Sequence, residues 1–404
     1  MINTGDTAFM IICAALVCLM TPGLAFFYGG LVSRKNVLTI MMQSFISMGV
    51  VTILWFFIGF SLTFGPDIHG IIGGLKYVCL SGVGMDANPD YGETIPFLSF
   101  FSYQQMFAIL TPALITGAFA DRVNFKSYLV FLIFWSILIY IPLAHWVWGG
   151  GFLQQLGVVD FAGGIVVHAS AGLAALASVF FVGKRNISDK AETEPHNVTH
   201  VALGTALLWF GWFGFNAGGA LGANALASTA FINTDIAAST AMVTWLIISW
   251  IKEKTPSFVG VLTGAVAGLA TITPGAGFVK PWSALIIGLV AGIACYFAVQ
   301  VRKKLDWDDA LDVWGVHGVG GIIGTILLGV FASKSVNGVS GLIEGDLYQF
   351  GIQLFGTVLA SVYAFIVTML ILKVVNKFLP VRVSREEERL GLDASLHHEE
   401  AYHL

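Results

Sequence analysis

Asp160-Phe-Ala-Gly-Gly-Ile-Val-Val-His168 and Asp309-Ala-Leu-Asp-Val-Trp-Gly-Val-His317 are two segments in which a histidine follows an aspartate by eight residues. If each aspartate lies at a membrane edge and the residues after it are helical, each histidine lies about 12 Å inside an apolar core roughly 30 Å thick. When the two segments enter from opposite faces, both histidines reach close to the middle of the membrane.

The composition around these segments is typical of a helical membrane protein. The chain of 404 residues is 56% hydrophobic and only 11% charged, and its mean hydropathy is +0.82. A soluble domain carries about a quarter charged residues, so this composition excludes an ordinary soluble fold. The apolar runs are long and unbroken, which favours helices over the alternating segments of roughly ten residues that build a transmembrane barrel.

Eleven stretches are apolar and approach or exceed the roughly 20 residues that a membrane span needs. They are residues 7–31, 37–60, 99–120, 127–147, 161–182, 199–220, 233–251, 257–275, 281–301, 314–332 and 348–375. A further apolar segment, residues 71–84, is shorter and contains Lys76 and four glycines. We expect that segment to lie in a loop.

The basic residues predict the orientation of the chain. With the N-terminus outside, the internal segments hold 17 lysines and arginines, and the external segments hold three, Lys76, Lys280 and Lys334. Cytoplasmic loops carry such an excess of basic residues. The sequence therefore predicts an all-α membrane protein with eleven transmembrane helices in the plasma or inner membrane, with the N-terminus outside and the C-terminus in the cytoplasm. The N-terminal segment lacks the basic region of a cleaved signal peptide, so we expect it to remain as the first span.

The paired histidine segments indicate an internal duplication. A half with five spans inserts in inverted orientation when it is duplicated, and transporters commonly bind their substrate between such halves. We expect residues 1–376 to form a single transmembrane domain that contains two pseudo-repeats, residues 1–183 and 199–332, and an eleventh helix at residues 348–375. Residues 377–404 are polar and form a cytoplasmic tail, which is either solvated and partly disordered or a regulatory contact surface.

The two histidines are the strongest candidates for a functional site. Ionisable groups inside a membrane are costly and usually face a cavity or each other. Burial disfavours the charged imidazolium, so His168 and His317 are expected to be neutral near pH 7. Two neutral imidazoles could share one hydrogen bond and still offer a ring nitrogen to a small molecule. A pair of packing histidines and bis-histidine haem ligation stay open as alternatives.

Aromatic residues form a second candidate group, near the predicted outer ends of the spans. They are Phe107, Trp148, Trp212 and Phe215. Aromatic faces attract a partly dehydrated cation by about 0.5–2 kcal/mol each, although an interfacial aromatic belt would place the same residue types there. Asp160 begins a helix, where it can cap exposed N–H groups and order an outer vestibule. The four cysteines show no metal-ligand spacing, and no metal or other cofactor and no nucleic-acid partner is expected.

The chain resembles the ammonium transporter family (Amt/Mep/Rh), and within it the prokaryotic Amt branch. Matching strings follow one another in order over nearly the whole chain. They are Thr21-Pro-Gly-Leu-Ala-Phe-Phe-Tyr-Gly-Gly30, Ala144-His-Trp-Val-Trp-Gly-Gly-Gly151, Asp160 to His168 as quoted above, Trp209-Phe-Gly-Trp-Phe-Gly-Phe-Asn-Ala-Gly218, Ala270-Thr-Ile-Thr-Pro274, Asp312-Val-Trp-Gly-Val-His-Gly-Val-Gly-Gly321 and Gly391-Leu-Asp-Ala-Ser395.

The resemblance implies a homotrimer with one pore in each subunit. It implies that Phe107 and Phe215 block the outer mouth of the pore, and that Trp148 forms a wall of an external ammonium site, with Asp160 as support. His168 and His317 would line the pore, and we place Trp212 with them. A PII-type (GlnK-like) regulatory protein would bind the internal loops and the tail.

Two positions depart from the family pattern. Many members have a serine beside the external site, and this chain has Gly219 there. Where a phenylalanine often precedes the gate by one helical turn, this chain has Tyr103, whose hydroxyl could partly replace the lost polar contact.

The sequence thus predicts that ammonium is recruited outside, loses a proton and crosses an apolar pore as ammonia, since the intact ion would lose its hydration at a cost of many kcal/mol. The proton either stays outside, as in a gas channel, or crosses separately along the histidines, as in an electrogenic transporter. An ammonium sensor of the same fold with little flux is the alternative within the family.

Overall fold

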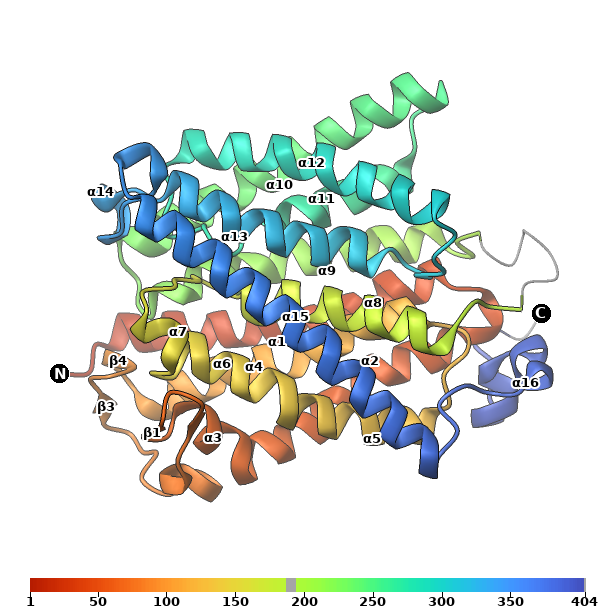
Figure 1. The fold of residues 1–404 in the computed structure, drawn as a ribbon, viewed down its shortest axis with the longest axis horizontal. Helices are drawn as coiled ribbons and strands as arrows, with labels where there is room; N and C mark the ends of the chain where they lie inside the picture. The colour runs from red at the N-terminus through yellow and green to blue at the C-terminus, as the bar shows by residue number, and fades with distance from the viewer. Residues whose placement is uncertain (187–193, 403–404) are drawn as a thin grey trace.

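The structure, a computed structural model, describes residues 1–186 and 194–402. Lys190, counted above among the internal basic residues, and His403 of the tail lie outside the described residues. Most of the described chain forms long helices that run side by side along the long axis of the molecule (Figure 1). The N-terminus and the C-terminus lie at opposite ends of this bundle (Figure 1). We call these two ends the N-side and the C-side.

Within the described residues, ten helical segments are long and apolar enough to cross a membrane. They are Thr4–Leu31, Arg34–Phe64, Phe97–Phe119, Phe125–Gln155, Gly164–Val182, Val198–Ala220, Ala225–Glu253, Pro281–Lys304, Trp314–Phe331 and Leu347–Phe378. They make the chain a multi-pass membrane protein and correspond in order to ten of the eleven predicted spans.

The remaining predicted span, residues 257–275, contains only a short helix. This helix, α11 (Phe258–Ile272), has 15 residues, and turns follow it. It contacts α9, α10, α12 and α13, so its neighbours enclose it. A helix enclosed in this way does not have to match the membrane thickness by itself. Residues 71–84 form a short strand, a 3₁₀ helix and turns in place of a spanning helix, as predicted.

The α-helices of the spans are often continued by short stretches of other helix types. The α-helices are α1 (Thr4–Leu31), α2 (Val37–Leu54), α3 (Phe60–Phe64), α4 (Phe97–Ile115), α5 (Phe125–Trp135), α6 (Ile141–Trp148), α7 (Phe152–Gln155), α8 (Ser170–Val182), α9 (Val198–Ala217), α10 (Ala225–Glu253), α11, α12 (Pro281–Lys304), α13 (Val319–Phe331), α14 (Lys334–Asn337), α15 (Leu347–Phe378) and α16 (Arg385–Leu390). The π-helices are η2 (Trp55–Gly59), η5 (Ser136–Tyr140), η6 (Gly164–Ala169), η9 (Trp314–Gly318) and η11 (Asp393–His397). The 3₁₀ helices are η1 (Arg34–Asn36), η3 (Leu75–Leu80), η4 (Thr116–Phe119), η8 (Gly218–Ala220) and η10 (Leu342–Glu344).

Four short strands form two antiparallel pairs on the N-side. β1 (Asp67–Ile68) pairs with β2 (Ile72–Gly73), and β3 (Ala87–Asn88) pairs with β4 (Gly92–Pro96). The backbone N–H of Asn3 donates to the carbonyl of Thr94, which attaches the start of α1 to this loop region.

The described part of the tail is folded against the C-side end of the bundle. Asp393 is buried, and its carboxylate accepts hydrogen bonds from the backbone N–H groups of Leu38 and Thr39 at 2.9 and 2.8 Å. It therefore caps the first turn of α2, whose N–H groups have no partner within the helix. Glu388 in α16 is also buried and accepts from Arg382 and Asn186.

A second ionic cluster lies on the C-side. Arg185 donates to Asp308 and to Asp121, and Arg122 lies beside Asp308. Burial raises the pKa of Asp308, but the hydrogen bonds and charges of Arg185 and Arg122 outweigh burial and lower the pKa to about 2. Because the pKa of Asp308 is depressed in the folded protein, its interactions with Arg185 and Arg122 stabilise the fold at pH values above the ordinary carboxyl pKa of about 3.9. This contribution is lost as the pH falls through the pKa of Asp308 in the folded protein.

We predict that Asp393→Ala detaches the tail without unfolding the bundle. Loss of a capping carboxylate costs about 0.5–2 kcal/mol, so the variant should be cleaved faster by protease after residue 378, and the melting temperature of the bundle should change little. Glu399→Ala, at an exposed carboxylate in the same tail, is the matched control. Equal cleavage rates in the two variants would contradict the capping role.

Candidate functional site

A hollow of about 360 Å³ opens on the N-side, and its lining includes five of the predicted site residues. These residues are Tyr103, Phe107, Trp148, Asp160 and Gly219. They come from four separate parts of the chain: α4, the end of α6, the loop before η6, and η8. We call this cavity the N-side hollow.

The turn around Asp160 forms part of the wall of the N-side hollow. The carboxylate of Asp160 accepts hydrogen bonds from the backbone N–H groups of Gly163, Gly164, Ile165 and Val166, at distances from 2.7 to 3.3 Å. Gly163 has a φ of 126°, which a residue with a side chain rarely adopts. The carbonyl of Asp160 accepts the indole N–H of Trp148 at 2.8 Å. Asp160 therefore both starts the helix that leads to His168 and fixes the Trp148 ring.

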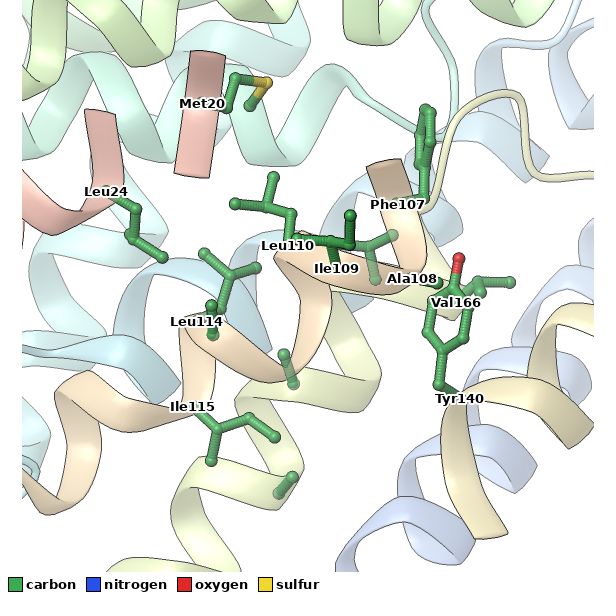
Figure 2. Close-up of a cluster of buried hydrophobic side chains, with 14 of the residues drawn as sticks. Met20, Leu24, Phe107, Ala108, Ile109, Leu110, Leu114, Ile115, Tyr140 and Val166 are labelled. Carbon is green, nitrogen blue, oxygen red and sulfur yellow. The ribbon is translucent and has the colours of Figure 1, made fainter. Parts of the chain in front are cut away.

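Two phenylalanine rings close the bottom of the N-side hollow. The ring centroids of Phe107 and Phe215 are 4.3 Å apart, and the Trp148 ring meets the edge of Phe107 at 6.1 Å. Phe107 is 1% exposed and Phe215 is fully buried. Phe107 lies on α4, which passes between Met20 and Leu24 of α1 on one side and Tyr140 on the other (Figure 2).

The two histidines lie directly beneath this pair. The ring centroid of His168 is 6.0 Å from that of Phe215, 5.3 Å from that of Trp212 and 5.2 Å from that of His317. The Trp212 indole N–H donates to the Thr273 hydroxyl at 2.9 Å, which holds its ring against His168. The predicted residues thus form one continuous series of rings.

The imidazole nitrogens of this series have no protein partner. Both ring nitrogens of His168 and Nδ1 of His317 are buried without a hydrogen bond. The bond that two neutral imidazoles could share is therefore not formed. An unpaired buried polar group costs about 1–3 kcal/mol, so these nitrogens favour a small molecule that can both donate and accept hydrogen bonds.

A second hollow, of about 260 Å³, lies on the C-side of His317 and is lined by His317, Tyr28, Arg302, Lys303 and Asp312 among others. We call it the C-side hollow. The ring series therefore lies between two cavities at opposite ends of the bundle. His317 borders the C-side hollow, and His168 borders neither hollow.

Two matching π-helices bring the histidines together. His168 lies in η6 and His317 lies in η9. Asp309 accepts from the N–H groups of Val313 and Trp314, as Asp160 does for η6. A Cβ atom at Gly172 would lie 2.1 Å from the backbone of Gly318, so only glycine at position 172 allows the two segments to cross this closely. Burial, with a smaller contribution from the charge of Asp312, raises the pKa of Asp309 to about 6 against the bonds from Trp314 and Val313.

Gly219 and Tyr103, the two positions that depart from the family pattern, have different surroundings. A Cβ atom at Gly219 would lie 2.7 Å from the carbonyl oxygen of Phe161 and 3.0 Å from its ring. Phe161 thus takes the space that a serine side chain would need. The hydroxyl of Tyr103 donates to the carbonyl of Phe215 at 2.6 Å, which leaves only its oxygen lone pairs as acceptors.

Sequence reasoning missed Tyr140 and Phe161. The hydroxyl of Tyr140 is buried without a hydrogen-bond partner, and the side chain points toward Val166 beside the helix that carries Phe107 (Figure 2). A tyrosine inside the predicted span 127–147 was the available signal, because a tyrosine of the interfacial belt lies at a span end. The role of Phe161 depends on a contact across 58 positions of sequence, and no local pattern reveals it.

The fold and the ring series define a membrane transporter or channel for a small polar molecule. The family model described as "Ammonium Transporter Family" matches residues 8–402. The ammonium transporter of Bacillus subtilis is 49% identical over 98% of this chain and 98% of that protein. The crystal structure of Candida albicans Mep2 has a TM-score of 0.89 at 35% identity and covers 96% of this chain and 88% of that chain. A solved structure titled "Sensor Amt Protein" has a TM-score of 0.89 at 32% identity and covers 97% of this chain and 98% of that chain.

The chain belongs to the ammonium transporter family. It transports ammonium or ammonia across a membrane and is not an enzyme, because the members of this family are transporters and channels. The sensor alternative is not favoured, since the named transporter is the more similar of the two relatives in sequence.

We predict that Gly219→Ser destabilises the protein by about 1–3 kcal/mol, because the added atoms have to displace Phe161. Thermal unfolding of the purified protein would measure this effect. Gly84→Ser is the matched control, since a Cβ atom at Gly84 meets no other atom within 4 Å. In a Phe161→Ala background the Gly219→Ser change should cost less than in the parent protein, because the contact with the ring is removed and only the contact with the backbone oxygen remains. A Gly219→Ser variant as stable as the Gly84→Ser variant would contradict the steric explanation.

Proposed function

We propose that this transporter binds ammonium in the N-side hollow, where ammonium releases a proton to the water that the open hollow admits, and that ammonia then passes along the ring series to the C-side hollow. The observation that carries the proposal is the unpartnered buried imidazole nitrogens, which lie between the two hollows. A neutral molecule that both donates and accepts hydrogen bonds fits these groups, and a bare cation does not.

Recruitment rests on the lining of the N-side hollow. Trp148 and Phe107 offer ring faces to a cation, which such faces attract by about 0.5–2 kcal/mol each. Tyr103 retains hydroxyl lone pairs, and ammonium has only N–H donors, so the two are chemically matched. Gly219 contributes no side-chain acceptor. Asp160 acts by holding the turn and the Trp148 ring, since four backbone N–H groups and the Trp148 indole already occupy its oxygens.

Conduction rests on the dryness of the ring series. An ion that enters it loses its water and gains no charged partner, which is strongly unfavourable. Ammonium avoids this cost by releasing its proton in the N-side hollow, so that neutral ammonia enters the ring series. Potassium has no proton to release, so the same segment excludes it. His168, His317 and Trp212 would then guide ammonia between the hollows.

The position of the termini supports the predicted topology. The described residues contain ten long helices and the short enclosed helix α11, and counting α11 as a passage makes the number odd, which agrees with chain ends at opposite ends of the bundle (Figure 1). We propose eleven spans in the cell membrane, with the N-side outside and the C-side in the cytoplasm. The shared structure of η6 and η9, each started by an aspartate, supports the inverted pseudo-repeats at residues 1–183 and 199–332.

We further propose that the protein forms a homotrimer in the lipid bilayer and that a PII-type regulatory protein binds its C-side face. The folded tail and the neighbouring loops give that face a defined surface. Light scattering of the purified protein in detergent should give a protein mass of three chains of 43.3 kDa each. A mass of one chain would contradict the trimer.

We predict that His168→Ala and His317→Ala each change ammonium flux by about tenfold or allow potassium to compete, because each removes part of the polar lining of the dry segment. Currents on supported membranes that contain the reconstituted protein, recorded at several pH values with and without potassium, would measure both effects. His398→Ala is the control, since His398 is exposed on the tail. Unchanged flux and selectivity in both pore variants would remove the imidazoles from the mechanism.

A further inference from the structure

His145 is a buried histidine outside the ring series, and the transport mechanism above does not use it. It lies in α6, three residues before Trp148, and is fully buried. Its Nδ1 atom is 2.7 Å from the carbonyl oxygen of Thr63, and its Nε2 atom is 2.9 Å from a carboxylate oxygen of Asp67. Both ring nitrogens therefore have close partners, in contrast to those of His168.

Both partners of His145 are acceptors. A backbone carbonyl cannot donate a hydrogen bond. The carboxylate of Asp67 also accepts from the backbone N–H of Gly70 at 2.9 and 3.0 Å and from the side-chain amide of Gln155 at 3.4 Å. A carboxylate that accepts this many hydrogen bonds is ionised. Each ring nitrogen of His145 must then carry a hydrogen, which is the imidazolium form.

The neighbouring titratable groups agree with this assignment. Helix α3 presents the Thr63 carbonyl, β1 presents Asp67, and α7 presents the neutral amide of Gln155. The hydrogen bond from His145 is the largest cause that lowers the pKa of Asp67. Tyr91, which also lies near Asp67, is kept neutral because burial and neighbouring acids raise its pKa. Asp67 is thus the ionised partner in direct contact with His145 in the described structure.

The turn after α6 leaves room for the hydrogen bond between His145 and Thr63. A Cβ atom at Gly149 would lie 2.0 Å from the Thr63 oxygen and 2.8 Å from Nδ1 of His145, so a larger residue would occupy the space of this hydrogen bond. The N–H groups of Gly149 and Gly151 both donate to the carbonyl of His145, at 3.0 and 2.9 Å. This turn immediately follows Trp148.

We propose that His145 is a positioning residue for the ammonium site, held as an imidazolium between Thr63 and Asp67, and that its charge fixes the loop from β1 to β2 against the turn that carries Trp148. The proposal rests on the proposed function for its effect on transport. The N–H of Phe152 also donates to the carbonyl of Gly70, so the same loop is joined to both sides of the turn. Loss of either ring hydrogen bond of His145 therefore loosens the wall of the N-side hollow.

The Asp67→Asn variant tests the charge of His145 while the imidazole ring of His145 is kept. An amide oxygen still accepts a hydrogen bond but no longer favours the imidazolium. We expect the ammonium concentration for half-maximal current to rise about tenfold, with the maximal current nearly unchanged, because site geometry and not conduction is altered. His69→Gln, at an exposed histidine between β1 and β2, is the control and should leave both quantities unchanged.

Solid-state NMR of the reconstituted protein with ¹⁵N-labelled histidine gives a readout that does not depend on transport. At about pH 7.5 an exposed imidazole is largely neutral. The signal of His145 is identified as the one that is missing from the spectrum of the His145→Gln variant. This signal should show two protonated ring nitrogens in the parent protein and one in the Asp67→Asn variant. One unprotonated nitrogen at His145 in the parent protein would overturn the proposal, as would an unchanged half-maximal concentration in Asp67→Asn. A parent protein that carries no ammonium current would refute the proposed function and the positioning role, and the NMR signal would still decide the charge of His145.

Discussion

The close crossing of two helical segments at Gly172 and Gly318 is the contact on which the passage depends. It brings η6 against η9, so two histidines that are far apart in the sequence lie with their ring centroids 5.2 Å apart. In a membrane, helices associate through close packing and not through the hydrophobic effect, so small residues decide where they meet. Each segment is also started by a buried aspartate that satisfies the first backbone N–H groups. Without these two aspartates, unpaired N–H groups would be left in an apolar environment.

The same arrangement explains how a protein can admit a cation and yet block its passage. The N-side hollow offers ring faces and oxygen lone pairs, which favour ammonium, whereas the segment beneath Phe107 and Phe215 offers only rings and unpaired imidazole nitrogens. Polarity is thus concentrated at the two ends, and buried rings whose imidazole nitrogens have no hydrogen-bond partner lie between them. Selectivity in this scheme comes from whether a molecule can become neutral, since size alone would not separate ammonium from potassium.

Much of this architecture could be predicted from the sequence, because its signals are local. Apolar runs of sufficient length located ten long helices, and the spacing of Asp160 and His168 and of Asp309 and His317 located the paired segments. Other features depend on contacts between distant positions and have no local pattern. The tail folds against α2 through pairs more than 350 residues apart, such as Asp393 with Leu38. Phe161 against Gly219 and Thr63 against His145 are contacts of the same kind. The short length of helix α11 could not be predicted either, because it depends on how the neighbouring helices enclose it.

The two hollows differ in charge, and this difference has a kinetic consequence. The N-side hollow is lined by the carboxylates Asp90 and Asp160 without a basic side chain among its lining residues, whereas Arg302 and Lys303 line the C-side hollow beside Asp312. A cation is therefore captured more readily on the N-side than on the C-side. A passive conduit has to obey detailed balance, so this asymmetry cannot move the final concentration ratio. It instead allows transport in the two directions to saturate at different ammonium concentrations, while the permeability at low concentration stays equal in both directions.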